Sequence, residues 1–168
     1  LFRSFEKMPI ENFIESMNKK LPEDIRIIEA KYMDDSKSIA ALISWAYYEI
    51  IFKANNIKSI EEIKELIDGW LKEEEILIKR VRHRRGKITE RTQNIRPLIG
   101  NIIIQDKKES TITMNCLLKA GDNGNLKASD LLEAIDKYLD IDIDFDSVDI
   151  KRLKLFTEIE GNIQSPMD

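Results

Sequence analysis

Two hydrophobic periodicities alternate along residues 46–156, and this alternation limits the folds that the chain can adopt. The sequence AYYEIIFKA at residues 46–54 alternates apolar and polar side chains, which is the pattern of a half-buried strand. Ser59 and Glu62 then have the spacing of a capping box, and an apolar stripe of helical period runs from Ile60 to Leu71. The segment therefore begins with a strand followed by a helix.

The remainder of this segment adds five strands and one helix and ends near residue 156. The predicted elements are strands 75–82 and 87–92, which pair around Gly86, strands 101–105 and 110–118, a helix over 128–139 and a strand over 148–156. Pro97 lacks an amide donor and therefore separates the two hairpins instead of lying inside a strand. This order is that of the split βαβ motif, so we predict an α+β fold, an antiparallel sheet with helices on one face, made of ferredoxin-like units.

The first 45 residues contain part of the same order. Apolar spacing predicts a helix over 9–20, residues 25–33 are rich in strand formers, and a short helix is expected over 36–45. The chain begins with Leu1 instead of methionine, and we expect it to be a fragment. We predict three parts. Residues 1–45 are the remainder of a first ferredoxin-like unit, and residues 46–160 form a second such unit. Residues 161–168 are a flexible tail.

Positive charge is concentrated in the first predicted hairpin. The whole chain has a net charge of -4, yet the sequence KRVRHRRGKITER at residues 79–91 holds seven Lys or Arg and one acid. Segregated charge creates a local field for an anionic partner, most often nucleic acid. We therefore predict contact with RNA or DNA, and the alternatives are an acidic protein surface or a solvated charge run without function. The candidate nucleic-acid-binding residues are Arg80, Arg82, Arg84, Arg85 and Lys87.

The glycine turn GDNGN at residues 121–125 is a second candidate site. Glycines that lead into a helix N-terminus expose backbone amides that can hold a phosphate. Lysines flank this turn, and the candidate anion-binding residues are Lys119, Gly121, Gly124 and Lys127. A plain turn without a ligand is the alternative.

The cysteine and histidine content excludes several kinds of chemistry. Cys116 and His83 are the only residues of their types, so the chain has no internal disulfide and too few soft ligands for a zinc or iron–sulfur site. Asp142, Asp144 and Asp146 alternate as in an EF-hand loop, but the glycine and glutamate of that loop are missing. We predict no catalytic residue, no metal and no cofactor within this chain, and a structural role for Cys116 in the core.

Hydropathy gives the expected location. No apolar run approaches the roughly 18 residues of a membrane-spanning helix, and no segment resembles a signal peptide. With 42% hydrophobic and 35% charged residues, the composition is typical of a soluble globular protein. We therefore predict a cytoplasmic protein without membrane contact.

Five short motifs occur in an order known from one bacterial family. They are LPEDIRIIEAKYM, AYYEI, NIRPLIGNIII, GNLKASDLLEAI and IKRLKLF, and together they span nearly all of residues 8–156. In this series the chain resembles the bacterial radical-SAM-linked domain of unknown function, a small protein fused to, or encoded beside, a radical-SAM protein. Members of that family start earlier, with Ser-His-Leu-Asp and Gly-Phe-Asn-Pro motifs that this chain lacks.

The resemblance implies a non-catalytic accessory role beside a radical-SAM enzyme, often in a neighbourhood of ribonuclease and ribosomal-protein genes. One cysteine cannot supply the three-cysteine cluster of such an enzyme, so this chain would present RNA or a ribosomal component to it. The first alternative is an enzyme subunit for RNA cleavage or modification, with its active site in the missing N-terminal region. The second alternative is a protein–protein interaction domain.

Overall fold

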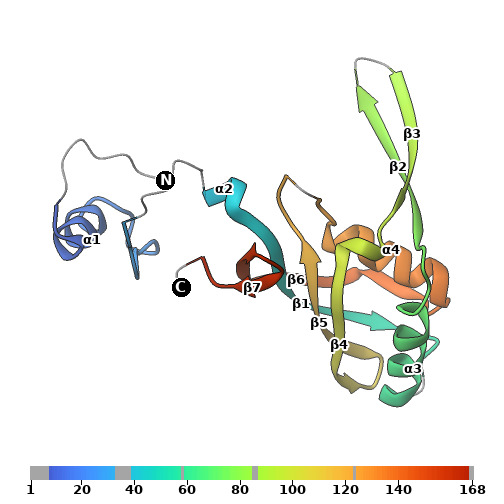
Figure 1. Cartoon of the computed structure of the whole chain (residues 1–168). Coiled ribbons are helices and arrows are strands. Elements are labelled where there is room, and N and C mark those ends of the chain that lie inside the picture. The colour runs from blue at the N-terminus through green and yellow to red at the C-terminus, as the bar shows by residue number, and fades with distance from the viewer. Residues whose placement is uncertain (1–7, 33–38, 58, 85–86, 123, 167–168) are drawn as a thin grey trace.

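The computed structural model describes residues 8–32, 39–57, 59–84, 87–122 and 124–166 (Figure 1). The helices are α1 (Ile10–Asn18), α2 (Ile39–Leu42), α3 (Ile60–Trp70) and α4 (Ala128–Leu139), with a 3-10 turn η1 (Arg96–Leu98). The strands are β1 (Ile43–Ala54), β2 (Leu77–Arg84), β3 (Lys87–Asn94), β4 (Ile99–Lys108), β5 (Thr111–Lys119), β6 (Ile143–Ile159) and β7 (Asn162–Gln164). None of the helices in these described residues has the length and apolar character needed to cross a membrane.

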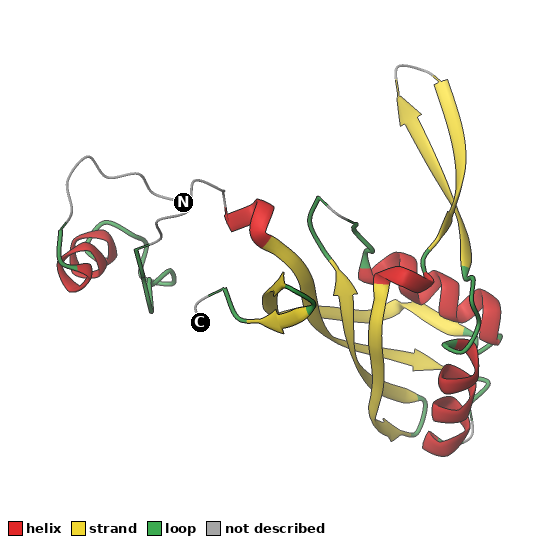
Figure 2. Ribbon diagram, in the orientation of Figure 1, coloured by secondary structure: helices red, strands yellow, loops and turns green. Residues whose placement is uncertain are grey.

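The strands form two separate sheets (Figure 2). Five strands make an antiparallel sheet in the order β4-β5-β1-β6-β7, and β2 and β3 pair only with each other. β1 is central because it pairs with β5 on one side and β6 on the other, so Ile50 lies opposite both Met114 and Ile150. Three register shifts interrupt the pairing of β1 with β6, and such irregularities bend a strand. The predicted α+β class with an antiparallel sheet is confirmed.

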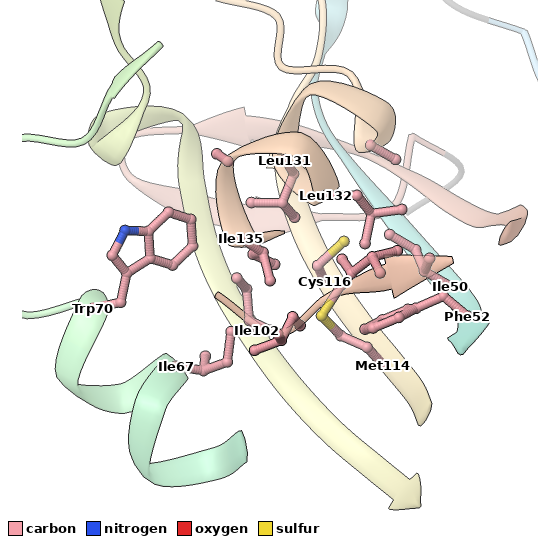
Figure 3. Close-up of a cluster of buried hydrophobic side chains, with 14 of the residues drawn as sticks. Ile50, Phe52, Ile67, Trp70, Ile102, Met114, Cys116, Leu131, Leu132 and Ile135 are labelled. Atoms are coloured by element: carbon pink, nitrogen blue, oxygen red, sulfur yellow. The ribbon is translucent and has the colours of Figure 1, made fainter. Parts of the chain in front are cut away.

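The hydrophobic core lies between this sheet and two helices (Figure 3). Alternate residues of β1 and β5 meet the apolar stripes of α3 and α4, as the two sequence periods require. The fully or almost fully buried members include Ile50, Phe52, Ile67, Met114, Cys116, Leu131, Leu132 and Ile135. The predicted placement of helices over one face is therefore observed. Burial raises the pKa of the Cys116 thiol to about 12, which keeps it an unreactive core side chain as predicted.

Two side chains fix the path of the chain between α3 and β4. The carboxamide oxygen of Asn94 accepts hydrogen bonds from the backbone N–H groups of Ile76 and Arg96, both at 3.0 Å. The Nε of Arg96 donates to the carbonyl of Leu71, just after α3, at 2.7 Å. Pro97 lies within η1, as expected of a residue that cannot donate to a ladder. These contacts hold the two ends of β2 and β3 against the body.

The N-terminal region differs from the sequence prediction in two places. No strand forms over residues 25–32, where instead the Asn18 side chain binds both backbone groups of Ile27, at 2.7 and 3.0 Å. Strand formers give a strand only where a partner strand is available, and α1 offers none. The predicted helix over 36–45 is wrong at its end, because β1 begins at Ile43 between β5 and β6; residues 33–38 lie outside the described structure.

Candidate nucleic-acid interface

The strands β2 and β3 form a ribbon that projects from the body of the protein (Figures 1 and 2). Their register runs from Leu77 opposite Asn94 at the root to Arg84 opposite Lys87 at the far end. Two fully buried residues anchor the root, since the N–H of Ile95 donates to the carbonyl of Ile76 at 2.8 Å. The hairpin predicted around the basic segment is therefore confirmed.

The register places most cations of the ribbon on one face. Residues that lie opposite each other in an antiparallel pair share a face, and the faces alternate along each strand. Positions on the basic face are Arg80, Arg82 and Arg84 of β2, which lie opposite Arg91, Thr89 and Lys87 of β3. Two of these pairs oppose like charges, and like charges directly opposite destabilise a strand pair. The register therefore concentrates positive charge on this face of the ribbon.

The far end of the ribbon is described only through its backbone pairing. The side chains of Arg82, Arg84 and Lys87, and the whole of Arg85, lie outside the described part of the structure. On the other face, Val81 of β2 is 50% exposed and Ile88 of β3 is 66% exposed. Among the ribbon side chains that the structure describes, these two therefore form no hydrophobic core of their own.

Arg80 holds the root of the ribbon against helix α4. Its Nη2 lies 2.8 Å from a carboxylate oxygen of Asp130 and donates to the carbonyl of Asn125 at 3.2 Å. The side chain is only 28% exposed, and its Nε is buried without a hydrogen-bond partner. Arg80 is therefore a fixed cation with one unused donor, in contrast to a freely moving surface arginine.

A groove of about 410 Å³ joins the two sites that the sequence predicts separately. It lies between the ribbon root and the glycine turn, and its lining residues are Arg80, Arg91, Thr92, Gln93, Asn94, Gly121, Asp122, Gly124 and Asn125. Gly121 and Gly124 both have positive φ, at 107° and 143°, which favours glycine at these positions. The turn brings its backbone close to the basic face of the ribbon, so both predicted features border one groove.

Lys119 adjoins the glycine turn through its backbone, because its carbonyl accepts the N–H of Leu126 at 3.0 Å, but its side chain lies on the sheet face that α3 and α4 leave open. Its Nζ is 2.5 Å from a carboxylate oxygen of Glu158 and 4.2 Å from the centre of the Trp45 ring. The Trp45 indole N–H donates to the same carboxylate at 2.8 Å. Hydrogen bonds from Lys119 and then Trp45 hold the pKa of Glu158 below its usual value. The charge of Lys119 is thus directed to Glu158 and not to the glycine turn.

Lys127 borders a different groove, on the other side of Arg80. It is the exposed N-cap residue of α4, and its side chain makes no capping hydrogen bond. The groove beside it runs between α4 and β2. The four candidate anion-binding residues are therefore not brought together around one point.

Arg91 is a residue of the basic face that the candidate set omits. It lies directly opposite Arg80, is exposed, and has no ion pair among the described residues. A signal was present in the sequence, because a hairpin in which residue 84 faces residue 87 must also place residue 80 opposite residue 91. Within the described part of the chain, Arg91 is thus a cation of the groove at the ribbon root that has no ion pair.

Comparison with known proteins gives a family. Residues 2–128 match the model of the family described as "Uncharacterized protein conserved in bacteria (DUF2344)". The chain belongs to this family. The match includes the ribbon and the glycine turn of this DUF2344 protein.

No curated protein matches the sequence. Among solved structures, the chain is similar to one chain of the "Crystal Structure of a Cbf5-Nop10-Gar1 Complex", with 16% sequence identity and a TM-score of 0.46. The similarity covers 69% of this chain and 32% of that chain, so this protein spans about a third of the length of the other.

Proposed function

We propose that this DUF2344 protein is a non-catalytic accessory module that contacts RNA through the basic face of its β2–β3 ribbon. The observation that carries the proposal is the register, which sets Arg80 opposite Arg91 and Arg84 opposite Lys87. Such pairs repel each other, although Asp130 offsets part of the charge of Arg80, and bound phosphates relieve the remaining repulsion. The cations at alternate positions of β2 are about 6.8 Å apart, twice the rise of a strand, which suits successive phosphates along one RNA strand.

The groove at the ribbon root supports the proposal with a fixed contact point. Asp130 orients the guanidinium of Arg80, and Arg91 faces the same groove without an ion pair among the described residues. An arginine held in place loses less side-chain entropy when it binds a phosphate than a mobile one does. Asp122 also lines the groove, and its carboxylate repels an anion on that side. A backbone phosphate would therefore approach from the side of the ribbon.

The strand order β4-β5-β1-β6, with α3 after β1 and α4 after β5, supports a ferredoxin-like assignment for the main unit. The radical-SAM partner and the cytoplasmic location rest on the ordered sequence motifs and on hydropathy alone. In this view, the module presents RNA or a ribosomal component to the radical-SAM enzyme.

The salt dependence of RNA binding tests the proposed contact. Five engaged cations on single-stranded RNA predict a slope of log affinity against log salt near about -3.5, at about 0.7 per contact. Replacement of Arg82, Arg84 and Arg85 by Ala should make that slope smaller in magnitude by about two units. Fluorescence anisotropy over a salt series measures both values, with each protein compared at matched salt.

A control with the same loss of charge separates the ribbon from general electrostatics. Lys20, Lys64 and Lys72 are exposed and belong to neither strand of the ribbon, so their replacement by Ala should leave the slope nearly unchanged. Unchanged affinity and slope in the ribbon variant would show that the ribbon is not the contact. Absence of salt-dependent RNA binding by the native chain would favour an acidic protein partner. RNA cleavage or modification by the chain itself would contradict the non-catalytic role.

A further inference from the structure

The outer edge of β2 carries backbone groups that the ribbon does not use. In an antiparallel pair, the N–H and C=O groups of alternate residues point toward the partner strand and away from it. The carbonyl of Ile76 accepts from Ile95, so the groups of residues 78 and 80 also face β3. The groups of Leu77, Lys79 and Val81 therefore point outward, on the side of helix α4.

Helix α4 already satisfies the first of these outward positions. The hydroxyl of Tyr138 donates to the carbonyl of Leu77 at 2.7 Å and accepts from its N–H at 3.3 Å. One residue of an added strand would make the same two hydrogen bonds. The next outward groups, those of Lys79 and Val81, have no hydrogen-bond partner among the residues that the structure describes.

A groove runs along this unpaired edge. It has a volume of about 550 Å³, and its lining residues are Leu77, Ile78, Lys79, Arg80, Val81, Lys127, Asp130, Glu133, Ala134 and Lys137. Four of them are basic and two are acidic, and one of the acids, Asp130, is neutralised by Arg80. The groove therefore combines exposed lysines, a partly apolar floor and a row of free backbone donors and acceptors.

We propose that this groove binds an extended segment of a partner protein, which adds to β2 as a third strand of the ribbon. Strand addition uses main-chain hydrogen bonds for affinity and side-chain pockets at alternate positions for specificity. Leu77, Lys79 and Val81 lie at alternate positions of β2 and therefore share one face, so the partner residues opposite them are also two positions apart. Acidic residues of the partner pair with Lys79, Lys127 and Lys137, and apolar residues two positions before and after the acid opposite Lys79 pack on Leu77 and Val81. The partner segment thus carries apolar and acidic residues in turn along one of its faces.

Charge makes a different protein a better occupant than a second copy of this chain. Lysine on an edge strand discourages identical edges from pairing, because the like charges then come together. Lys79 lies on this edge, and residues 79–91 of the ribbon hold seven Lys or Arg and one acid. The same lysine attracts a strand of opposite charge.

Amide hydrogen exchange followed by NMR tests the proposal with a defined probe. The probe is a nine-residue peptide with blocked ends, in which valine and aspartate take turns at every second position and threonine stands between them, so that one face of the strand carries both valine and aspartate. At about ten times its Kd, the peptide should slow exchange at Lys79 and Val81 by about tenfold. Exchange at residues 78 and 80, whose amides already face β3, should change much less. The alternation distinguishes strand addition from any other mode of binding.

Proline substitutions give a matched pair of variants. Val81→Pro removes an outward N–H and leaves every hydrogen bond to β3 in place, so it should abolish peptide binding without unfolding the ribbon. Ile88→Pro removes an outward N–H from the opposite edge of the ribbon and should bind the peptide as the native chain does. In a third variant, Lys79→Glu should weaken binding of the valine–aspartate peptide and strengthen that of a valine–lysine peptide, whereas Lys72→Glu should change neither.

Several outcomes would overturn the proposal. They are equal protection at residues 78–81, no protection by a saturating peptide, full binding by Val81→Pro, or self-association through β2 detected by sedimentation. The result is independent of the RNA contact, because replacement of Arg82, Arg84 and Arg85 by Ala alters the basic face and leaves the edge of β2 intact. Peptide binding by that variant together with lost RNA binding would support both proposals.

Discussion

The sheet-and-helix body and the β2–β3 ribbon use the same antiparallel pairing with opposite results for their side chains. In the body, alternate residues of β1 such as Ile50 and Phe52 are fully buried under α3 and α4. In the ribbon, Val81 and Ile88 are half-exposed or more, although their backbones are paired as well. Backbone pairing gives the strand its shape, whereas burial gives the domain most of its stability. The side chains of the ribbon are therefore available to contact a binding partner.

The largest expected effect is a loss of stability from the body. Phe52→Ala should lower the free energy of unfolding by about 3–5 kcal/mol, because it removes a fully buried ring and leaves a cavity. Urea denaturation followed by circular dichroism measures the loss. Phe145→Ala, at a half-exposed phenylalanine of β6, is the matched control and should cost far less. Equal losses at the two positions would contradict the described core.

The glycine turn beside the ribbon should show an intermediate effect. Gly124→Ala should destabilise by about 1–3 kcal/mol, because φ is 143° and an added Cβ would lie 2.9 Å from Cδ2 of Leu98. Gly69→Ala in α3 has open space and should stabilise by about 0.5–1 kcal/mol. Thermal and chemical denaturation of the two variants give the opposite signs directly. A stabilising Gly124→Ala change would show that the turn adopts another conformation.

The ribbon itself should contribute little to stability. Replacement of Arg82, Arg84 and Arg85 by Ala should change the free energy of unfolding by no more than about 0.5 kcal/mol, with a small gain where Arg84 no longer faces Lys87. The same variant should lose much of its RNA affinity, as proposed above. A loss of several kcal/mol on denaturation would mean that the ribbon is part of the core, and the contrast between the two regions would fail.

The smallest effect should appear only as a pH dependence at the open sheet face. The pKa of Glu158 is lowered from its usual 4.5 by the hydrogen bond from Lys119 and then by that from Trp45. A lowered pKa in the folded state stabilises the protein above pH 4.5, and this contribution is lost as the pH falls through the lowered value. Glu158→Gln should therefore be less stable than the native chain near neutral pH, with a difference that shrinks in acid. A difference independent of pH would contradict the assignment.

Much of the body could be predicted from the sequence because its local signals agree with its tertiary contacts. The apolar stripe over residues 128–139 predicts a helix, and α4 has those bounds. Ser59 predicts a helix start, and its hydroxyl accepts the N–H of Glu62 at 3.1 Å. Cys116 alternates with polar residues, and it is buried. In each case the period of the sequence matches the side that the core covers.

The interface could be predicted only in part, because its geometry depends on contacts that are distant in the sequence. Composition and turn signals predict the run of basic residues and the hairpin, but the candidate residues do not include Arg91, which the register of the structure sets opposite Arg80. The ion pair of Arg80 with Asp130 depends instead on how α4 lies beside β2. The same is true of Lys119, whose partner Glu158 lies 39 residues away. Side-chain partners of this kind have no local pattern.

The sequence by itself determined which segments of the body are strands and helices and where positive charge gathers, because hydrophobic period and charge are local properties. The tertiary structure decided which strands pair with each other and which side chains come into contact. Residues 25–32 are rich in strand formers yet form no strand, since a strand exists only with a partner to accept its hydrogen bonds. The edge of β2 became a groove only because Tyr138 and α4 pack beside it, leaving the outward groups of Lys79 and Val81 open. Pairing and packing join residues far apart in the chain, and only the folded backbone specifies which ones meet.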